Sequence, residues 1–197
     1  MTDFPLVFLN NNSVWVGKTK NNQPDGPGWL VESDGTKLKG RYENAEKNGV
    51  WAIISSNSKG TCNFKNGIAH GEYVSYYEDK KVILIQKYED GKHLESETFK
   101  EDGSYSREEF KDDKQHGKVT MLFKDGKSHE FIFEDGKKIK HPKSNDINGA
   151  SGDITEDSKQ MVLQIKEIYL DKLRVIQNLT QWTLPDDVME NIKKGKN

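Results

Sequence analysis

The chain has 197 residues, of which 30 are lysine or arginine and 32 are aspartate or glutamate, giving a formal net charge of -2. This balance argues against a protein that binds nucleic acid over a broad basic surface. Only 32% of the residues are hydrophobic and the mean hydropathy is -0.90, which argues against a compact two-layer domain with a large interior. We therefore expect an elongated fold that needs few apolar residues per unit length.

Residues 1–13 contain a short apolar run in which Phe4, Leu6 and Phe8 alternate with other residues. No basic residue precedes the run and no small-residue cleavage pattern follows it, so it does not have the pattern of a signal peptide. The run is also much shorter than the roughly 20 residues that a membrane span needs. We expect residues 1–13 to form an edge segment that covers the first β-hairpin.

Residues 61–77 form a unit that recurs along the chain as far as residue 140. Phe64 ends an extended run, and Asn66-Gly67 follows at once, a dipeptide that readily adopts the positive φ angles of a tight hairpin turn. In the next extended run Tyr73 and Tyr77 point to one face, because side chains alternate along a strand. The unit is therefore predicted to be one β-hairpin.

Two columns of residues keep the same period, with successive members 22 to 24 residues apart. The first column consists of Thr19, Tyr42, Phe64, Tyr88, Phe110 and Phe133, and the second of Trp29, Trp51, Tyr73, Ser96 and Val119. Turns are expected at Asp34-Gly35, Asn48-Gly49, Asn66-Gly67, Asp90-Gly91, Asp102-Gly103, Asp125-Gly126 and Asp135-Gly136. This regularity predicts a mostly β protein with a single-layer antiparallel sheet of consecutive hairpins over residues 14–140.

The repeated unit resembles the MORN repeat, in which an aromatic residue, a Lys-Asn-Gly or Lys-Asp-Gly turn and a His-Gly pair follow one another. The matching segments include Phe64-Lys65-Asn66-Gly67 with His70-Gly71, and Phe110-Lys111-Asp112 with His116-Gly117. The Tyr-Glu-Gly opening of a typical MORN repeat appears here as Leu38-Lys39-Gly40. The resemblance covers residues 14–140. It implies an elongated sheet of MORN-type hairpins.

Residues 141–157 are rich in Ser, Asn and Gly and are typical of a polar linker. Residues 158–197 have helical spacing. Asp157 and Gln160 match a capping-box pattern, which predicts an amphipathic helix from about 158 to 181. The expected apolar face consists of Met161, Ile165, Ile168, Ile176 and Leu179, widened by Val162, Tyr169 and Leu173.

After Trp182, the segment Pro185-Asp186-Asp187 predicts the start of a second, short helix. Its apolar residues on one side are expected to be Leu184, Val188, Met189 and Ile192.

The apolar face of the long helix must be covered, because eight exposed residues of this kind would promote aggregation. Either the helix folds back along one face of the sheet, or another chain holds it. We favour folding back, onto a floor formed by Trp51, Ile53, Tyr73 and Tyr77. A protein partner would then recognise helix and sheet as one unit, with candidate interaction residues Trp29, Trp51, Tyr73, Tyr77, Ile165, Tyr169, Leu173 and Ile176.

A basic cluster of Lys137, Lys138, Lys140 and Lys143 follows the last aromatic of the first column. It could bind acidic phospholipid at a membrane surface. The acidic residues of the adjacent linker could instead neutralise it locally, which is the reading that we favour.

No residue set in the sequence indicates catalysis. His70 and His116 stand before glycine and are expected to be turn residues, while His93, His129 and His141 show no metal-ligand spacing with Cys62. The glycines of the repeats stand where hairpin turns and strands are expected. None in the chain directly joins a strand to the start of a helix, as the glycines of a phosphate-binding loop do. We therefore predict no catalytic residue, no metal, no cofactor and no small-molecule substrate, and hence no enzymatic activity.

Proteins that share the MORN resemblance include radial spoke head components of cilia, cytoskeletal scaffolds of protists and junctional membrane proteins. The resemblance thus implies a non-catalytic scaffold or adaptor that joins protein partners in a larger assembly, cytoskeletal or ciliary. The single cysteine, Cys62, suits a reducing compartment, so a cytoplasmic location is expected. The alternatives are a peripheral membrane protein that uses the basic cluster, or a regulatory subunit of an enzyme.

Overall fold

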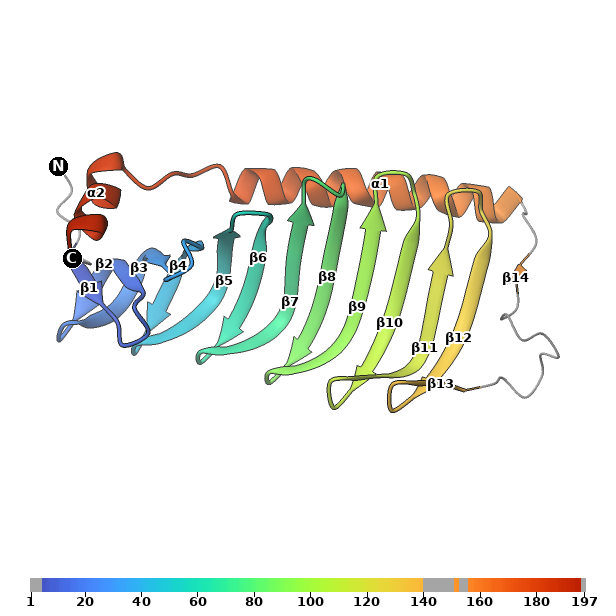
Figure 1. The fold of residues 1–197 in the computed structure, drawn as a ribbon, viewed down its shortest axis with the longest axis horizontal. Helices are drawn as coiled ribbons and strands as arrows, with labels where there is room; N and C mark the ends of the chain where they lie inside the picture. The colour runs from blue at the N-terminus through green and yellow to red at the C-terminus, as the bar shows by residue number, and fades with distance from the viewer. Residues whose placement is uncertain (1–4, 140–150, 153–155, 196–197) are drawn as a thin grey trace.

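The computed structural model describes residues 5–139, 151–152 and 156–195. In these residues strands β1 to β13 form one open sheet in sequence order, each antiparallel to the next, and β14 pairs with β12. Successive hairpins stand side by side along the long axis of the molecule, and two C-terminal helices follow (Figure 1). The predicted fold class, a mostly β single-layer sheet of consecutive hairpins with a C-terminal amphipathic helix and a second short helix, is confirmed.

The strands are β1 Leu6–Phe8, β2 Val14–Lys20, β3 Gln23–Val31, β4 Lys37–Glu43, β5 Glu46–Ile54, β6 Lys59–Lys65, β7 Ile68–Tyr77, β8 Val82–Glu89, β9 Lys92–Lys100, β10 Tyr105–Lys111, β11 Lys114–Leu122, β12 Ser128–Glu134, β13 Lys137–Ile139 and β14 Ser151–Gly152. The helices are α1 Glu156–Leu179 and α2 Asp186–Gly195. Helix α1 thus begins and ends two residues before the predicted bounds, and Asp157 lies in its first turn and not at its cap.

The N-terminal segment forms the predicted edge strand, since β1 pairs with β2. Of the expected inward residues, Leu6 packs against the buried valines of the sheet. Phe8 is 51% exposed, whereas Val7 and Leu9 pack against buried residues of the sheet. Phe4 lies outside the described residues.

Two-residue turns join the strands along the lower edge of the sheet in Figure 1, and their residues have positive φ angles. Asn66-Gly67 and Asp90-Gly91 are such turns, as predicted. The predicted turn at Asn48-Gly49 is wrong, because this dipeptide lies inside β5 and the turn is at Asn44-Ala45. Gly49, with φ 69°, lies opposite the irregularity in the register of β4. There glycine permits the left-handed backbone of a bulge.

The cross-strand pairs assign each side chain to one of two faces. Trp51, Cys62 and Tyr73 are opposite one another on what we call the open face. The other side, the helix face, carries α1 and α2. Trp29 pairs with Val16 and lies on the helix face, so its place in the second repeat column is wrong by one residue. The open-face position of that column belongs to Gly28.

Aromatic rings fill the N-terminal half of the open face. The centroids of Trp15 and Tyr42 lie 4.9 Å apart and those of Tyr42 and Trp51 lie 5.2 Å apart, both in edge-to-face geometry. A Cβ on Gly40 would lie 2.2 Å from the Trp51 ring, and one on Gly28 would lie 2.5 Å from the Trp15 ring. Glycine at these two sites therefore lets the indoles lie flat on the backbone of the strands.

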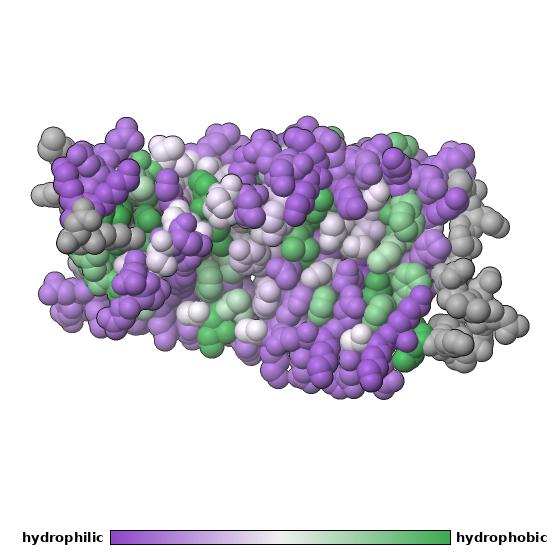
Figure 2. Space-filling model, viewed as in Figure 1, coloured by the Kyte–Doolittle hydropathy of each residue, from purple (hydrophilic) through white to green (hydrophobic). Residues whose placement is uncertain are grey.

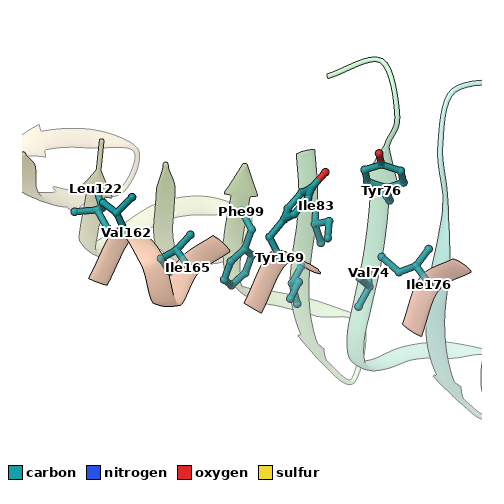
Figure 3. Close-up of a cluster of buried hydrophobic side chains, with 10 residues drawn as sticks. Val74, Tyr76, Ile83, Phe99, Leu122, Val162, Ile165, Tyr169 and Ile176 are labelled. Atoms are coloured by element: carbon teal, nitrogen blue, oxygen red, sulfur yellow. The ribbon is translucent and has the colours of Figure 1, made fainter. Parts of the chain in front are cut away.

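Cross-strand rows on the helix face explain where α1 lies. We call the turns on the edge opposite the two-residue turns the upper turns (Figure 1). The row nearest them is apolar and consists of Tyr76, Ile83, Phe99, Tyr105 and Leu122. Helix α1 runs back along this row, from the C-terminal hairpins towards the middle of the sheet (Figure 1). Its buried residues Val162, Ile165, Tyr169 and Ile176 pack on the row and on Val74 and Ile85 (Figure 3).

The prediction that the helix folds back onto the sheet is confirmed, and of its predicted apolar face Val162, Ile165, Tyr169, Leu173 and Ile176 do pack on the sheet. Its other details were wrong. Met161, Ile168 and Leu179 are 52%, 40% and 45% exposed and do not face the sheet. The predicted floor of Trp51, Ile53, Tyr73 and Tyr77 lies on the open face, because side chains at odd and even positions of a strand point to opposite sides.

Helix α2 covers the N-terminal part of the helix face. Leu184 and Ile192 are buried against Val14, Val16 and Val31, and the side chains of Trp29, Val188 and Met189 pack around them. The predicted apolar side of the second helix is thus confirmed.

The contact between α1 and the sheet can be tested by its effect on the free energy of unfolding. Ile165→Asp places a carboxylate in the apolar contact between α1 and the sheet, where Ile165 is 7% exposed. We expect a loss of roughly 3 kcal/mol or more in the free energy of unfolding, measured by urea denaturation. Leu163→Asp is the matched control, since Leu163 is 53% exposed and two residues away on the same helix. Equal effects of the two changes would contradict this position of α1.

Gly103 tests how closely the upper turns approach α1. A Cβ on Gly103 would lie 2.6 Å from Cγ1 of Val162 and 3.0 Å from the Val162 carbonyl oxygen. Gly35 has the same φ of 89° in an equivalent Asp-Gly turn, but nothing lies within 4 Å of its Cβ position. Gly35→Ala therefore measures the cost of the left-handed backbone alone, about 1–2 kcal/mol. We expect Gly103→Ala to cost about 1–3 kcal/mol more in urea denaturation, from overpacking against α1.

Candidate protein-interaction surfaces

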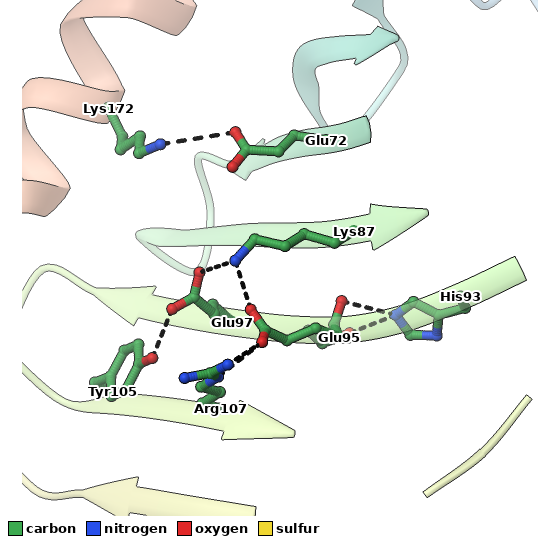
Figure 4. A network of polar contacts seen from close by, with 9 residues as sticks. Glu72, Lys87, His93, Glu95, Glu97, Tyr105, Arg107 and Lys172 are labelled. Carbon is green, nitrogen blue, oxygen red and sulfur yellow. Dashed lines mark hydrogen bonds and ion pairs between the residues drawn. The ribbon is translucent and has the colours of Figure 1, made fainter. Parts of the chain in front are cut away.

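Below α1, the helix face carries a belt of paired charges from strands β7 to β12. Cross-strand register brings Glu72, Lys87 and Glu95 into one row, parallel to the helix. Glu95 accepts a hydrogen bond from Lys87 Nζ at 2.6 Å and further hydrogen bonds from Arg107 (Figure 4). Lys87 Nζ also lies 3.6 Å from Glu97.

Two more contacts extend this belt towards its ends. Tyr105 donates its hydroxyl proton to Glu97 at 2.7 Å, and Lys118 pairs with Glu130 at 2.5 Å. Lys172 of α1 lies 3.9 Å from Glu72, which connects the helix to the belt (Figure 4). We define the charge belt as Glu72, Lys87, Glu95, Glu97, Arg107, Lys118 and Glu130.

Glu95 is the centre of the charge belt, and its side chain is 11% exposed. Burial raises the pKa of this carboxyl, but hydrogen bonds from Lys87 and Arg107 outweigh burial, so the pKa lies below its ordinary value. The buried carboxylate is therefore held ionised by two cations. The arrangement is that of a structural ion-pair network, because each charged group that it exposes is already paired within the chain.

The lowered pKa predicts how stability depends on pH. The folded state holds Glu95 ionised more strongly than the unfolded state does, so its contribution is full above the ordinary pKa of 4.5 and is lost as pH falls through the lowered value. In Glu95→Gln this contribution is absent at every pH, so we expect lower stability at neutral pH and a shallower acid loss. Urea denaturation across acidic pH measures both. The exposed Glu156→Gln, on the first turn of α1, is the control and should leave the profile unchanged.

The C-terminal half of the open face is less completely filled than the N-terminal half. Trp15 and Trp51 are 0% exposed, whereas Tyr88, His93 and Phe110 are partly exposed. The His93 ring stacks between the other two, at centroid distances of 5.2 Å and 4.1 Å. The row of aromatic side chains thus continues along the sheet, and its rings are partly exposed from Phe64 on β6 onward.

Neutral polar and apolar side chains surround these aromatic rings. The central open-face positions of β8 to β11 carry Gln86, Ser96, Thr98, Ser106, Glu108 and Met121. Glu108 is the one carboxylate among these six positions, and Gln115 donates a hydrogen bond to it at 2.7 Å. Protein interfaces are enriched in aromatic residues and depleted of charge at their centre. The open face of β8 to β11 has this composition, and the charge belt behind it does not.

Apart from Trp29, the interaction residues that were predicted from the sequence lie partly in the contact between α1 and the sheet and partly on the open face. Ile165, Tyr169, Leu173 and Ile176 pack between α1 and the sheet. Trp51 is buried in the N-terminal aromatic row, and Tyr73 packs against that row. Tyr77 is partly exposed on the open face and Lys80 Nζ lies 5.6 Å from its ring.

Trp29 belongs to a separate group on the helix face. Lys39 Nζ lies 5.7 Å from the Trp29 ring and 6.0 Å from the ring of Trp182, in the segment between α1 and α2. These cation–π contacts help to hold that segment against the sheet.

The histidines before glycine connect neighbouring lower turns. Asp90 donates its backbone N–H to His70 Nδ1 at 3.4 Å, and Asp135 does the same to His116 at 3.4 Å. Asn48 takes this role one repeat earlier, with its side-chain oxygen accepting from Asn66 N at 3.1 Å. The prediction that His70 and His116 are turn residues is wrong, because they lie inside β7 and β11 and each contacts a residue of the neighbouring turn.

The basic cluster is only partly described by the structure. Lys137 and Lys138 lie on the exposed edge strand β13, whereas Lys140 and Lys143 lie outside the described residues. Lys138 Nζ lies 3.7 Å from the centroid of Phe131, which gives this lysine a packing role at the end of the sheet.

The described residues contain no group of three or more His, Cys, Asp or Glu side chains that could hold a metal ion. Neither described helix is long and apolar enough to cross a membrane. The charge belt and the neutral open face were not predicted from the sequence. Both depend on which residues of neighbouring strands lie opposite each other, and single-strand patterns do not specify that register.

No protein-family model matches the chain. A search of curated proteins likewise finds no match.

Proposed function

We propose that the protein is a non-catalytic repeat scaffold that joins protein partners in a larger assembly, and that one partner binds the open face of β8 to β11. The resemblance to MORN repeats supports a cytoplasmic assembly of cytoskeletal or ciliary type. The proposal rests mainly on one observation: the partly exposed rings of Tyr88, His93 and Phe110 have mostly neutral neighbours, while the reverse side of the same strands is charged.

The fold gives physical support to a scaffold role. Each hairpin contacts its neighbours through continuous cross-strand pairing, so positions along the sheet are held at fixed spacing. A long row of half-buried aromatic side chains offers large contact area at small cost in side-chain entropy. The row can therefore bind an extended segment or an edge of a protein partner without rearrangement of the sheet.

Two cross-strand neighbours on this surface allow a specific test. Thr98 and Ser106 are partners on β9 and β10 and are partly exposed on the open face. The double change Thr98→Arg and Ser106→Arg should place two cations at the centre of the neutral surface and abolish partner binding without unfolding the sheet. Thr120→Arg, a partly exposed position on the helix face of β11, is the matched control.

The measurement is cross-linking and affinity purification of the tagged native chain, followed by quantitative mass spectrometry. We expect stoichiometric protein partners with the native chain and with Thr120→Arg, and a loss of at least tenfold with the double variant. Partners that are retained equally by all three chains would contradict the open face as the binding surface. A native chain that holds no stoichiometric partner would contradict the scaffold function.

A further inference from the structure

Helix α1 exposes large apolar side chains on two sides in addition to the side that it buries. Met161, Ile168 and Val175 are 52%, 40% and 54% exposed, and they recur at intervals of seven residues. Residues seven apart on a helix lie within about 20° of one line along its surface. We call these three residues, with Leu179 at 45% exposure, the α1 stripe.

Two contacts show which way the α1 stripe points. Lys172, which lies beside the stripe on the helix surface, reaches Glu72 of the charge belt at 3.9 Å. Lys166, on the other side of the buried face, lies beside Gly103 in an upper turn, 3.0 Å from its Cβ position. The α1 stripe therefore points sideways over the charge belt, and Leu163 and Leu170 point towards the upper turns.

The outermost side of α1, opposite the sheet, is polar. Between the α1 stripe and the Leu163 side it carries exposed residues Gln164, Glu167, Asp171, Arg174 and Asn178. The helix thus has an apolar side on its own sheet, an apolar stripe at right angles to it, and a polar outer side.

We propose that the α1 stripe is the contact surface for a second copy of this chain, with the two α1 helices parallel and in register. A straight apolar line at seven-residue spacing matches another helix laid alongside it, as in a coiled-coil seam. In a parallel pair Met161, Ile168 and Val175 each meet their own counterpart. Any partner helix in this position must be apolar on the side towards the stripe and polar on the side towards the charge belt. The α1 helix of a second copy has both properties.

The direction of the pair follows from geometry. Around α1, the side on the sheet, the α1 stripe and the polar outer side follow one another in a fixed rotational order. If two α1 helices met through their stripes in an antiparallel arrangement, both sheets would lie on the same side of the helix pair and would overlap. A two-fold axis along the helices places the sheets on opposite sides. The polar outer side of each α1, including Glu167 and Asp171, then faces the charge belt of the other copy, which exposes Lys87 and Arg107 by 41% and 48%.

The size of this contact is sufficient for a specific dimer. Helix α1 has 24 residues, so it is roughly 36 Å long and about 10 Å wide. The dimer would bury roughly 2,000 Å² of accessible surface in total, at the upper end of standard interfaces. This area includes the contact between the two helices and the contact that each helix makes with the charge belt of the other copy.

Light scattering of the full chain after size exclusion at micromolar concentration tests the self-association. We expect twice the monomer mass of 22.5 kDa for the native chain and the monomer mass for Ile168→Glu. Leu170→Glu, at a site that is 50% exposed on the other flank of α1, is the matched control and should remain dimeric. Circular dichroism and the melting curve should show both variants folded. A monomeric native chain, or equal mass for the two variants, would overturn the proposal.

Cysteine cross-linking tests the direction of the helices. Met161→Cys, Ile168→Cys and Val175→Cys should each give a disulfide-linked dimer with an added oxidant, whereas Leu163→Cys should not. The native Cys62 does not interfere, because it is 2% exposed and burial raises the pKa of its thiol to about 11. A cross-link with Ile168→Cys alone would indicate antiparallel helices and would overturn the parallel arrangement.

Discussion

A sheet that is one layer thick has two faces, and an apolar row on either face must be covered by another element or shielded by side chains of the sheet itself. On the helix face the row from Tyr76 to Leu122 determines where the C-terminal segment must go. Because α1 covers that row, the five neighbouring strands beneath it, β7 to β11, are fixed in register. The charge belt depends on the same register, since Glu95 meets Lys87 and Arg107 only when β8, β9 and β10 are aligned as they are.

The open face solves the same problem without a second layer. In its N-terminal half the indoles of Trp15 and Trp51 lie flat against strands that carry glycine beneath them, and Tyr42 fills the space between. Towards the C-terminus the large rings become fewer and small polar residues such as Ser96 and Ser106 take their places. Stability and accessibility are therefore distributed along the chain: the first hairpins form a closed aromatic core, and the later hairpins present a surface.

The hairpin architecture could be predicted because its signals are local. Asn66-Gly67 and Asp90-Gly91 determine the turns where they stand, and the repeat period places the strands between them. The face on which each side chain lies could not be predicted in the same way, because a register shift of one residue moves every side chain of a strand to the other face. Trp29 precedes Trp51 by one repeat period, but the glycine at position 28 occupies the equivalent site on the open face.

The buried side of α1 was predicted only in part, for a different reason. The helix has apolar residues on its flank and also on the side that faces the sheet. Met161 and Ile168 therefore fit a helical apolar stripe as well as Val162 and Tyr169 do. Only the position of the sheet decides between them, and it buries Val162 and Tyr169. Similarly, the paired charges of the belt are scattered in the sequence and meet through strand register.

The two apolar sides of α1 have different physical consequences. A helix that lies on one sheet buries only an arc of its surface, so Val162 and Tyr169 are fully used in the monomer, while Met161, Ile168 and Val175 are only about half buried. Fully burying an aliphatic side chain contributes roughly 1.5–3 kcal/mol, and half of that remains unused for each residue of the α1 stripe. The charge belt below cannot supply the missing contact, because covering its ions with apolar groups would cost more than it gained. A cover for the stripe must therefore be amphipathic in the same sense as α1, and this requirement links the fold of one chain to its assembly.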